Sequence, residues 1–441
     1  MSDNYAADAV VIFVYTAATR KMDIPEDVVH LRVDPSVTSI PDNAVWWCKK
    51  LTKVELCEGL VEIGKCSFFD CDQSITKINI PNSLRRIKDN AFVSSLRCPI
   101  RLHDGIESIG IYAFNGCIFT NFRIPSLITI IPHGLLWDCR STFSVELYEH
   151  ITEIGCKAFN TCCCLQNVAF PPNADVGDYI FDKAADLLRL FGSVARIIRN
   201  LKHRFDRLPI HRIVYYHSYN ENVLQKLIAA INTRLGQHRT LRSKLDPTGN
   251  QQDFLGMTPL HILACSSVHD LELYRVIVDN YPTNLIIEDA WGATPLLYAF
   301  WGAAPPEIIQ FLLDSYQLLY PDHEFNWTMM MKTLGLFGTP KEHIENLLHV
   351  RQTHFSDHAI DWVYLLDAFA ARLQFYNGEQ FPEQNMKFLF TCSMSSRVEA
   401  LSFKVWRDHI THMIRTFNFR RDNSATLREI EQNLIILTLN P

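Results

Sequence analysis

The sequence contains no apolar run long enough to cross a membrane. Its longest strongly apolar run extends from Ala9 to Tyr15, whereas a membrane-spanning helix needs about 20 residues. Asp3 and Asp8 precede this run, in place of the basic segment that opens a secretory signal peptide. We therefore expect neither a membrane helix nor a signal peptide, and we predict a cytoplasmic protein, with the nucleus as the alternative compartment.

Signatures of common enzyme classes are also missing. The sequence has no P-loop, no dinucleotide-binding glycine fingerprint and no Gly-x-Ser-x-Gly elbow. His409 and His412 beside Asp408 have a spacing that could serve a metal, and His261 lies one helical turn before Cys265. Surface exposure explains the first group more simply, and packing explains the second. We predict no enzymatic activity, cofactor, metal site or small-molecule substrate, and we keep an enzyme site in the C-terminal helices as the third hypothesis.

Neither sign of charge dominates the chain, although one segment is strongly basic. The 441 residues include 42 Lys and Arg and 48 Asp and Glu, for a net charge of −6. The segment 187–245 holds twelve Lys and Arg against Asp206 and Glu221. Such a stretch can bind RNA, phosphate or an acidic protein tail. The alternative is a junction whose basic side chains pair with acidic neighbours or stay solvated, and no aromatic RNA-binding motif accompanies the charges.

The cysteines follow a regular spacing. Eleven of the thirteen lie between Cys48 and Cys164, and five of them recur at intervals of 23, 46, 22 and 23 residues. A small residue at one place in each repeat indicates a column of buried thiols rather than a disulfide framework or a zinc module. The members of this cysteine column are Cys48, Cys71, Cys117, Cys139 and Cys162.

The first half of the chain repeats every 22 to 24 residues. An Ile opens each unit, a Val, Phe or Leu follows five residues later, and an apolar–polar–apolar triplet completes it. The triplet has the period of a half-buried strand. A unit of this size cannot bury its own apolar side, so stacked units must cover one another. The opening residues are Ile40, Ile63, Ile87, Ile109, Ile131 and Ile154.

The pattern Ile-Gly-x-x-Ala-Phe-x-x-Cys, at 109–117 and 154–162, resembles the BspA-like leucine-rich repeat family. Six units match, over about 40 to 173. The resemblance implies a curved solenoid that recognises proteins or glycans. Many members of that family are cell-surface proteins.

After Pro172 the strand pattern gives way to helical periodicity. Gly256-Met257-Thr258-Pro259-Leu260-His261 resembles the ankyrin repeat, 292–297 is a partial copy and 208–211 a weaker one. Thr258 is suited to cap a helix and Pro259 to its first position. A second apolar helix is expected after each copy, at 222–231, 271–280 and 307–319, and five further helices are expected beyond Tyr320.

The polar residue inside each strand triplet must face away from the core, because side chains alternate across a strand. Stacked parallel strands lie about 4.8 Å apart, so these residues form an outward column. We select as candidate partner-binding residues Lys53, Glu55, Lys77, Asn79, Arg101, Arg123 and Glu146. The column is positive at its centre and acidic at its flanks, which suits a partner with a complementary acidic stripe. A plain solvated sheet face is the alternative.

The sequence thus predicts an α+β protein of two joined solenoids. We expect an N-terminal segment at 1–23, a leucine-rich-repeat solenoid at 24–173, a helical bridge at 174–205 and an ankyrin-like helical region at 206–440. Solenoids offer long faces suited to macromolecules. The predicted function is a non-enzymatic scaffold that binds protein partners, and the alternative is an RNA- or phosphate-binding module that uses segment 187–245.

Overall fold

The computed structural model describes residues 12–20, 23–25, 27–72, 74–181, 185–219, 222–232, 246–302 and 304–323. The chain divides into two units, 1–323 and 324–441, and all described residues belong to the first. The described residues end at 323. The helices expected beyond Tyr320 and the group around His409 therefore lie outside the described residues.

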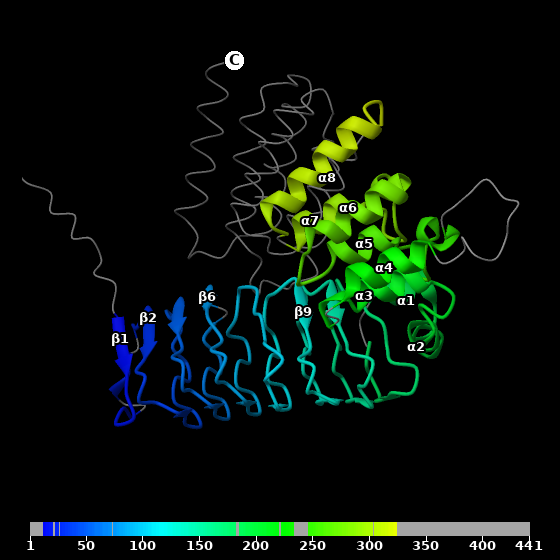
Figure 1. Ribbon diagram of the computed structural model, residues 1–441. Coiled ribbons are helices and arrows are strands. Elements are labelled where there is room, and N and C mark those ends of the chain that lie inside the picture. Colours follow the sequence, from blue (N-terminus) through cyan, green and yellow to red (C-terminus); the bar gives the residue numbers. More distant parts are fainter. Residues whose placement is uncertain are drawn as a thin grey trace, which may run out of the picture. The chain divides into compact units, whose positions relative to one another are not determined.

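Two ladders of short parallel strands run along the solenoid (Figure 1). The first ladder consists of β1 (Ile12–Tyr15), β2 (His30–Val33), β4 (Lys53–Glu55), β6 (Lys77–Ile78), β9 (Asn121–Arg123) and β11 (Ser144–Glu146). The second consists of β3 (Ser39–Ile40), β5 (Glu62–Ile63), β7 (Arg86–Ile87), β8 (Ser108–Ile109), β10 (Ile130–Ile131), β12 (Glu153–Ile154) and β13 (Asp175–Val176). Each ladder is divided into two hydrogen-bonded sheets, with breaks between β6 and β9 and between β8 and β10. Pairing of β1 with β2 and of β13 with β12 extends the solenoid beyond the expected bounds of 24 and 173 at both ends.

The predicted apolar columns form the core of the solenoid. All six opening Ile residues are buried. The Phe rings that follow them stack from coil to coil, with ring centroids 5.2 Å apart between Phe68 and Phe92 and 5.6 Å apart between Phe92 and Phe114. Each coil therefore covers its neighbour, as the repeat predicts.

Each coil also turns through two residues with left-handed backbone, φ between 51° and 67°. These positions recur with the repeat, at Asn43, Cys66, Asn90, Tyr112, Gly134, Lys157 and Tyr179, and at Trp47, Asp70, Ser94, Gly116, Asp138 and Thr161. Asn, Asp and Gly tolerate this conformation well. The other residue types are held in it by hydrogen bonds between successive coils, such as Tyr112 N to His133 O at 3.0 Å.

The cysteine column is buried, and none of its five thiols forms a disulfide with another described cysteine. Burial raises the pKa of Cys71 and of Cys117 to about 12. The Sγ of Cys162 points to the carbonyl of Leu136 at 3.0 Å, while that of Cys163 lies 3.5 Å from the carbonyl of Arg140. No cluster of His, Cys, Asp and Glu in the described part of the chain has the geometry of a metal site.

We expect thiol titration of the native protein at pH 8 to leave the cysteine column unmodified. All five thiols are buried, and the raised pKa values of Cys71, Cys117, Cys139 and Cys162 keep those four protonated at this pH. Only the partly exposed Cys57, Cys66, Cys156 and Cys163 of the described cysteines should react. Peptide mapping after alkylation measures this, with denatured protein as the fully reactive control. Rapid native labelling of Cys117 or Cys139 would contradict the assignment.

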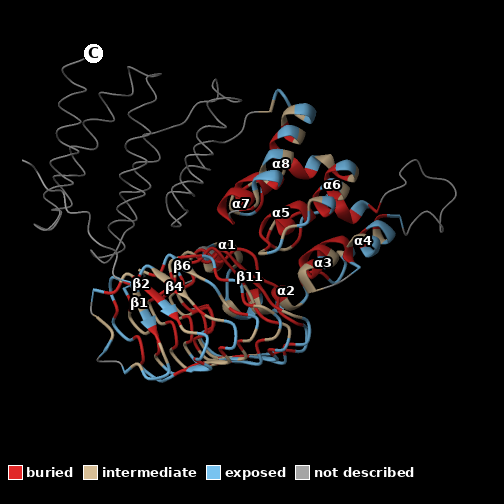
Figure 2. Cartoon of the chain, turned by 60° about the vertical axis from the view of Figure 1, so that its left-hand side comes forward, coloured by how far each residue is buried: buried red, intermediate tan, exposed pale blue. Residues whose placement is uncertain are grey.

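The second part of the unit is helical. Its elements are α1 (Ala185–Phe191), α2 (Val194–Lys202), α3 (Pro209–Tyr215), α4 (Val223–Asn232), α5 (Pro259–Ala264), α6 (Leu271–Asn280), α7 (Pro295–Trp301) and α8 (Pro306–Leu319). Helices α3, α5 and α7 pack side by side as an inner row, and α4, α6 and α8 form an outer row against them. Figure 2 shows α5 and α7 almost entirely buried. None of the described helices has the length and apolarity needed to cross a membrane.

The predicted helix starts are confirmed. Pro209, Pro259 and Pro295 each occupy the first turn of a helix. At α5, Thr258 and His261 form a reciprocal capping box. His261 Nδ1 accepts from Thr258 N at 3.1 Å and lies 2.8 Å from its hydroxyl, while Nε2 faces the carbonyl of Ala293 at 3.0 Å. Burial lowers the pKa of His261 to about 4, so the ring is neutral and serves as a structural link.

We expect Thr258→Ala to reduce the free energy of unfolding of the helical part by about 1 kcal/mol, because the buried cap loses its hydroxyl. Chemical denaturation followed by the fluorescence of the helical tryptophans measures this. Thr283→Ala is a matched control, since that exposed hydroxyl caps no helix and bonds to Asn250 Oδ1. Equal stability of the two variants would show that the capping box contributes little.

Candidate interaction face of the solenoid

The outward side chains of the first ladder form the strand face, which contains all seven candidate residues. Hydrogen bonds to the helices begin at β9 and continue to Phe170. We call β9, β11 and residues 166–170 the covered half of this face. We call β1, β2, β4, β6 and residues 97–102 the open half; among the described residues, no hydrogen bond or ion pair joins it to a helix.

The ladder is interrupted between the two halves. Residues 97–102 form no strand, although Ile100 and Leu102 are buried as in other coils. Pro99 has no N–H to donate to a neighbouring coil. Three residues separate Leu96 from Ile100, whereas two separate Ile75 from Ile78. The additional residue and the missing donor together explain why the ladder resumes only at β9.

Arg123 belongs to the covered half. Its guanidinium carbon lies 4.2 Å from the ring centre of Tyr219, and Nη2 donates to Ser218 O at 3.3 Å. Nη1 and Nη2 also form a bidentate pair with Asp104, at 3.0 and 2.8 Å. The side chain that we expected to contact a partner thus contacts the chain's own helical part. Reversal of its charge would disrupt this docking, so Arg123 is not a neutral surface probe.

Glu146 is buried, contrary to the expectation of an exposed residue. It retains 2% exposure at the centre of the covered half. Its carboxylate accepts from Ser218 Oγ at 3.0 Å, from Ser266 Oγ at 3.2 Å and from Ser267 N at 2.5 Å. These donors come from the end of the α3 region and from the loop that precedes α6. The carboxylate therefore joins one strand to two helical units.

Tyrosine hydroxyls of the helical part bond to backbone N–H and C=O groups of the covered half. Tyr215 OH donates to Val145 O at 2.9 Å and accepts from Ala169 N at 3.0 Å. Tyr219 OH lies 3.1 Å from both Ile124 O and Glu146 O. Burial raises the pKa of Tyr215 to about 12, so its hydroxyl stays a donor.

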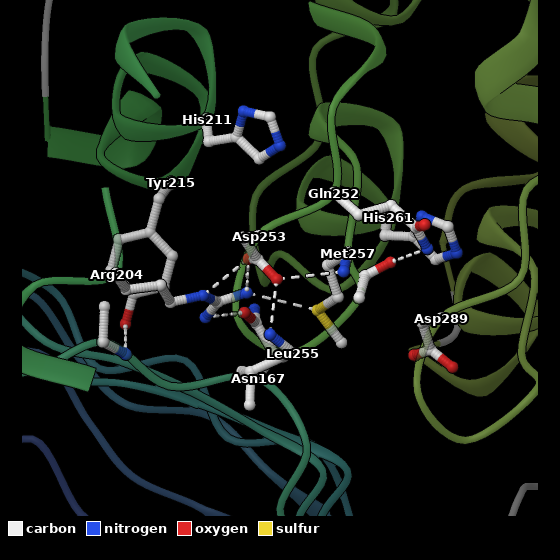
Figure 3. Close-up of polar contacts among 12 residues, drawn as sticks. Asn167, Arg204, His211, Tyr215, Gln252, Asp253, Leu255, Met257, His261 and Asp289 are labelled. Carbon is white, nitrogen blue, oxygen red and sulfur yellow. Dashed lines mark hydrogen bonds and ion pairs between the residues drawn. The ribbon is translucent and has the colours of Figure 1, made fainter. Parts of the chain in front are cut away.

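A fully buried ion pair lies at the junction (Figure 3). Arg204 donates through Nε and Nη2 to Asp253 Oδ2, at 2.7 and 2.6 Å. Its Nη1 donates to Asn167 Oδ1 at 2.7 Å and to Val168 O at 3.0 Å. Both charged side chains have 0% exposure. Arg204 therefore connects the last strand segment of the solenoid to the loop that precedes α5.

The sequence carries a signal for this ion pair that lies just outside the Gly-x-Thr-Pro pattern. Asp253 stands three residues before the Gly of the first Gly-x-Thr-Pro copy, and Asp289 holds the same place in the second. Each Asp accepts two backbone N–H groups through Oδ1, from Leu255 and Met257 in the first copy and from Trp291 and Ala293 in the second. The Asp is thus part of the repeat turn, and Arg204 pairs with its second oxygen.

An aromatic contact seals the edge of the covered half. Phe143 stacks on Trp301 of α7, with centroids 5.3 Å apart, and packs beside Tyr298 at 5.6 Å. Tyr298 OH also donates to Gln166 Oε1 at 2.6 Å. Because all four residues are buried, this edge resembles the interior of one domain rather than a loose contact.

On the open half, Glu55 is surrounded by basic side chains. Arg32 Nε lies 2.8 Å and His30 Nε2 3.2 Å from its carboxylate, and Lys53 also forms an ion pair with it. The hydrogen bonds from Lys53 and Arg32 lower the pKa of Glu55 to about 2. Glu55 and Lys53 are therefore engaged with each other at the surface.

Asn79 stabilises the coil itself. Its Oδ1 accepts from Leu56 N at 3.0 Å, and its Nδ2 donates to Leu56 O at 2.8 Å. Lys77 and Arg101 are exposed, and none of the described residues forms an ion pair or a hydrogen bond with either side chain. Of the seven candidates, these two present free charge on the strand face.

Some basic side chains of segment 187–245 form ion pairs within the chain. Arg204 is buried in its ion pair, and Arg212 pairs with Glu149 through Nε at 2.8 Å. Arg196 and Arg199 lie exposed on α2. Residues 233–245, which carry four of the twelve basic residues, lie outside the described part. An anionic partner at this segment stays a prediction.

The parallel ladders and stacked apolar columns define a β-solenoid of short coils. Residues 26–140 and 73–188 match the family model of the BspA type Leucine rich repeat region, in six copies. The N-terminal part of this chain is therefore a leucine-rich-repeat solenoid of BspA type. No curated protein matches the chain significantly.

Several solved structures of bacterial leucine-rich repeat proteins are similar to the solenoid. A leucine-rich repeat protein from Bacteroides ovatus is 24% identical, with a TM-score of 0.34, over 39% of this chain and 44% of that protein. The T. pallidum Leucine Rich Repeat protein is 20% identical, with a TM-score of 0.28, over 35% of this chain and 83% of that protein. A leucine rich cell surface protein from Faecalibacterium prausnitzii is 16% identical, with a TM-score of 0.23, over 39% and 64%. The match thus spans less than half of the first of these proteins.

Proposed function

We propose that this protein is a non-enzymatic interaction scaffold that binds a protein partner on the open half of its strand face. The supporting observation is the division of that face. In the covered half, outward polar residues of successive coils hold another protein surface, the chain's own helical part, through charge-assisted hydrogen bonds. The open half has the same outward geometry and exposes cations that lack a described partner.

We propose in addition that the helical part is an ankyrin-like array and forms part of the same scaffold. Three arguments support it: two rows of paired helices, prolines at the starts of the inner helices, and the bond from His261 to the backbone of the following copy. Docking on the covered half makes the solenoid and the inner row one platform. A partner then meets a preorganised surface, which reduces the ordering cost of binding.

Site-specific photocrosslinking tests the scaffold function. A photoreactive amino acid replaces Thr76 next to the open half in the full chain, in the cells that normally make it. Thr152 is the matched control, because it is likewise exposed and its hydroxyl likewise bonds to the carbonyl of the preceding coil, at 3.2 Å. We expect a discrete partner adduct from position 76 alone. Adducts of equal yield from both positions, or none from position 76, contradict binding at this face.

A further inference from the structure

Three basic side chains at the inner end of the open half form no ion pair or side-chain hydrogen bond with the described residues. Lys77 and Arg101 are exposed, and Arg97 is partly buried. Among the described residues, none forms an ion pair or accepts a side-chain hydrogen bond from them. Burial lowers the pKa of Arg97. We call Lys77, Arg97 and Arg101 the basic trio.

The members of the trio lie on two successive coils. The bridge between Ile75 and Leu96 aligns Arg97 with Thr76, directly before Lys77. Arg101 takes the outward position that Asn79 holds in the coil before it. Successive coils lie about 4.8 Å apart, so Lys77 and Arg101 stand on neighbouring coils, and Arg97 precedes Arg101 by four residues in the same coil.

Fold stability does not account for this arrangement. Lys53 and Lys77 are direct neighbours in the ladder, and Arg101 is followed by Arg123 in the next coil. Like charges on adjacent strands are destabilising when nothing neutralises them. Lys53 and Arg123 have carboxylate partners in Glu55 and Asp104, whereas Lys77 and Arg101 have none in the described part of the chain. A bound anion would remove this repulsion.

The surroundings give the trio a closed side and an open side. On one side of the trio the next strand of the face is β9, where Asn121 Nδ2 donates to Ser266 O, in the loop before α6, at 3.2 Å. Toward β1, the one carboxylate at the outward strand positions is Glu55, which already contacts Arg32, Lys53 and His30. The helical part thus bounds the trio on one side, and the open strands continue on the other.

We propose that the basic trio binds an acidic, extended segment of a protein partner, with two or more Asp or Glu carboxylates seated on Lys77, Arg97 and Arg101. This inference rests on the proposed scaffold function and specifies the chemistry of the partner. Arg presents a planar fork that matches a carboxylate. Outward strand positions of the open half near the trio carry no aromatic side chain, so they offer no platform for stacking bases, which favours a peptide over RNA.

Fluorescence anisotropy with a labelled hexaglutamate peptide tests the inference on the full chain at about 150 mM salt. We expect the wild type to bind, and the double variant Lys77→Glu with Arg101→Glu to bind about tenfold more weakly or worse. The matched control is Arg196→Glu with Arg199→Glu, which changes the net charge equally at exposed positions of α2. We expect the control to retain affinity within about twofold. Arg97→Gln removes one positive charge without introducing a negative one, and it should also weaken binding. Circular dichroism confirms that each variant is folded.

Three outcomes overturn the inference. The wild type does not bind hexaglutamate, the two double variants lose affinity equally, or a labelled uridine oligonucleotide binds the trio more tightly than the peptide does. A crosslinked partner at position 76 together with any of these results leaves the scaffold function standing and removes the acidic partner. Absence of that crosslink with trio-dependent peptide binding retains the anion site and removes the scaffold.

Discussion

Arg204→Ala should lower the free energy of unfolding by about 3–5 kcal/mol, which is the largest loss that we expect from a single substitution at the junction. The change leaves Asp253 as a buried, unpaired carboxylate and removes the donors to Asn167 and Val168. Breaking one side of a buried ion pair is costly because the remaining charge stays desolvated. The loss should appear in both parts of the unit, since Arg204 connects them.

Arg212→Ala is the matched control for this prediction. Arg212 also joins a helix to the solenoid, but its pair with Glu149 is exposed, and such pairs contribute about 0–1 kcal/mol. Denaturant unfolding followed by hydrogen exchange, with exchange resolved for residues 143–170 and 246–264, measures both variants. The double replacement Arg204→Met with Asp253→Leu should regain much of the loss, because it leaves no buried charge. Equal effects of Arg204→Ala and Arg212→Ala would refute the role assigned to the buried pair.

Glu146→Ala should cost about 2–3 kcal/mol and release the helices from the covered half. Its removal leaves Ser267 N and two serine hydroxyls without their acceptor in a buried site. Hydrogen exchange should therefore accelerate at 144–147 and at 266–268. The strands β1 to β6 have no described bond to the helices, so their exchange should not change.

Two further variants separate hydrogen bonding from bulk destabilisation at this site. Glu146→Gln keeps one acceptor oxygen but places an NH₂ group among donors, so its effect should lie between those of wild type and Glu146→Ala. Glu149→Ala removes a carboxylate three residues away that is exposed, and it should change stability by about 0.5 kcal/mol or less. Uniform acceleration of exchange throughout 12–323 in Glu146→Ala would argue against a local role for this carboxylate.

The solenoid was predictable from the sequence because its contacts are local in register. Ile63 packs against the Ile residues one coil before and after it, and the same holds for Phe92 and for the cysteine column. A repeat of apolar residues therefore identifies both the strand and its neighbour. The left-handed turns could not be predicted from the sequence, because Tyr112, Lys157 and Trp47 occupy them as well as Asn, Asp and Gly.

The candidate site was predictable only in part. Sequence alternation assigned Arg123 and Glu146 to the side away from the solenoid core, where both side chains contact another surface. That surface belongs to the same chain, through Ser218 and Ser266, which lie 72 and 120 residues from Glu146. No periodicity relates positions at such separations, so the sequence could not distinguish an internal partner from an external one.

The sequence by itself determined the coil length, the core columns, the helix starts and the direction of each strand side chain, because each depends on residues within one or two repeats. Tertiary structure alone decided how far the strand face is covered. Tyr215, Arg204 and Trp301 find their partners only after the helical rows fold back onto β9 and β11. The same folding leaves Lys77 and Arg101 exposed, without a hydrogen bond or ion pair to the described helices.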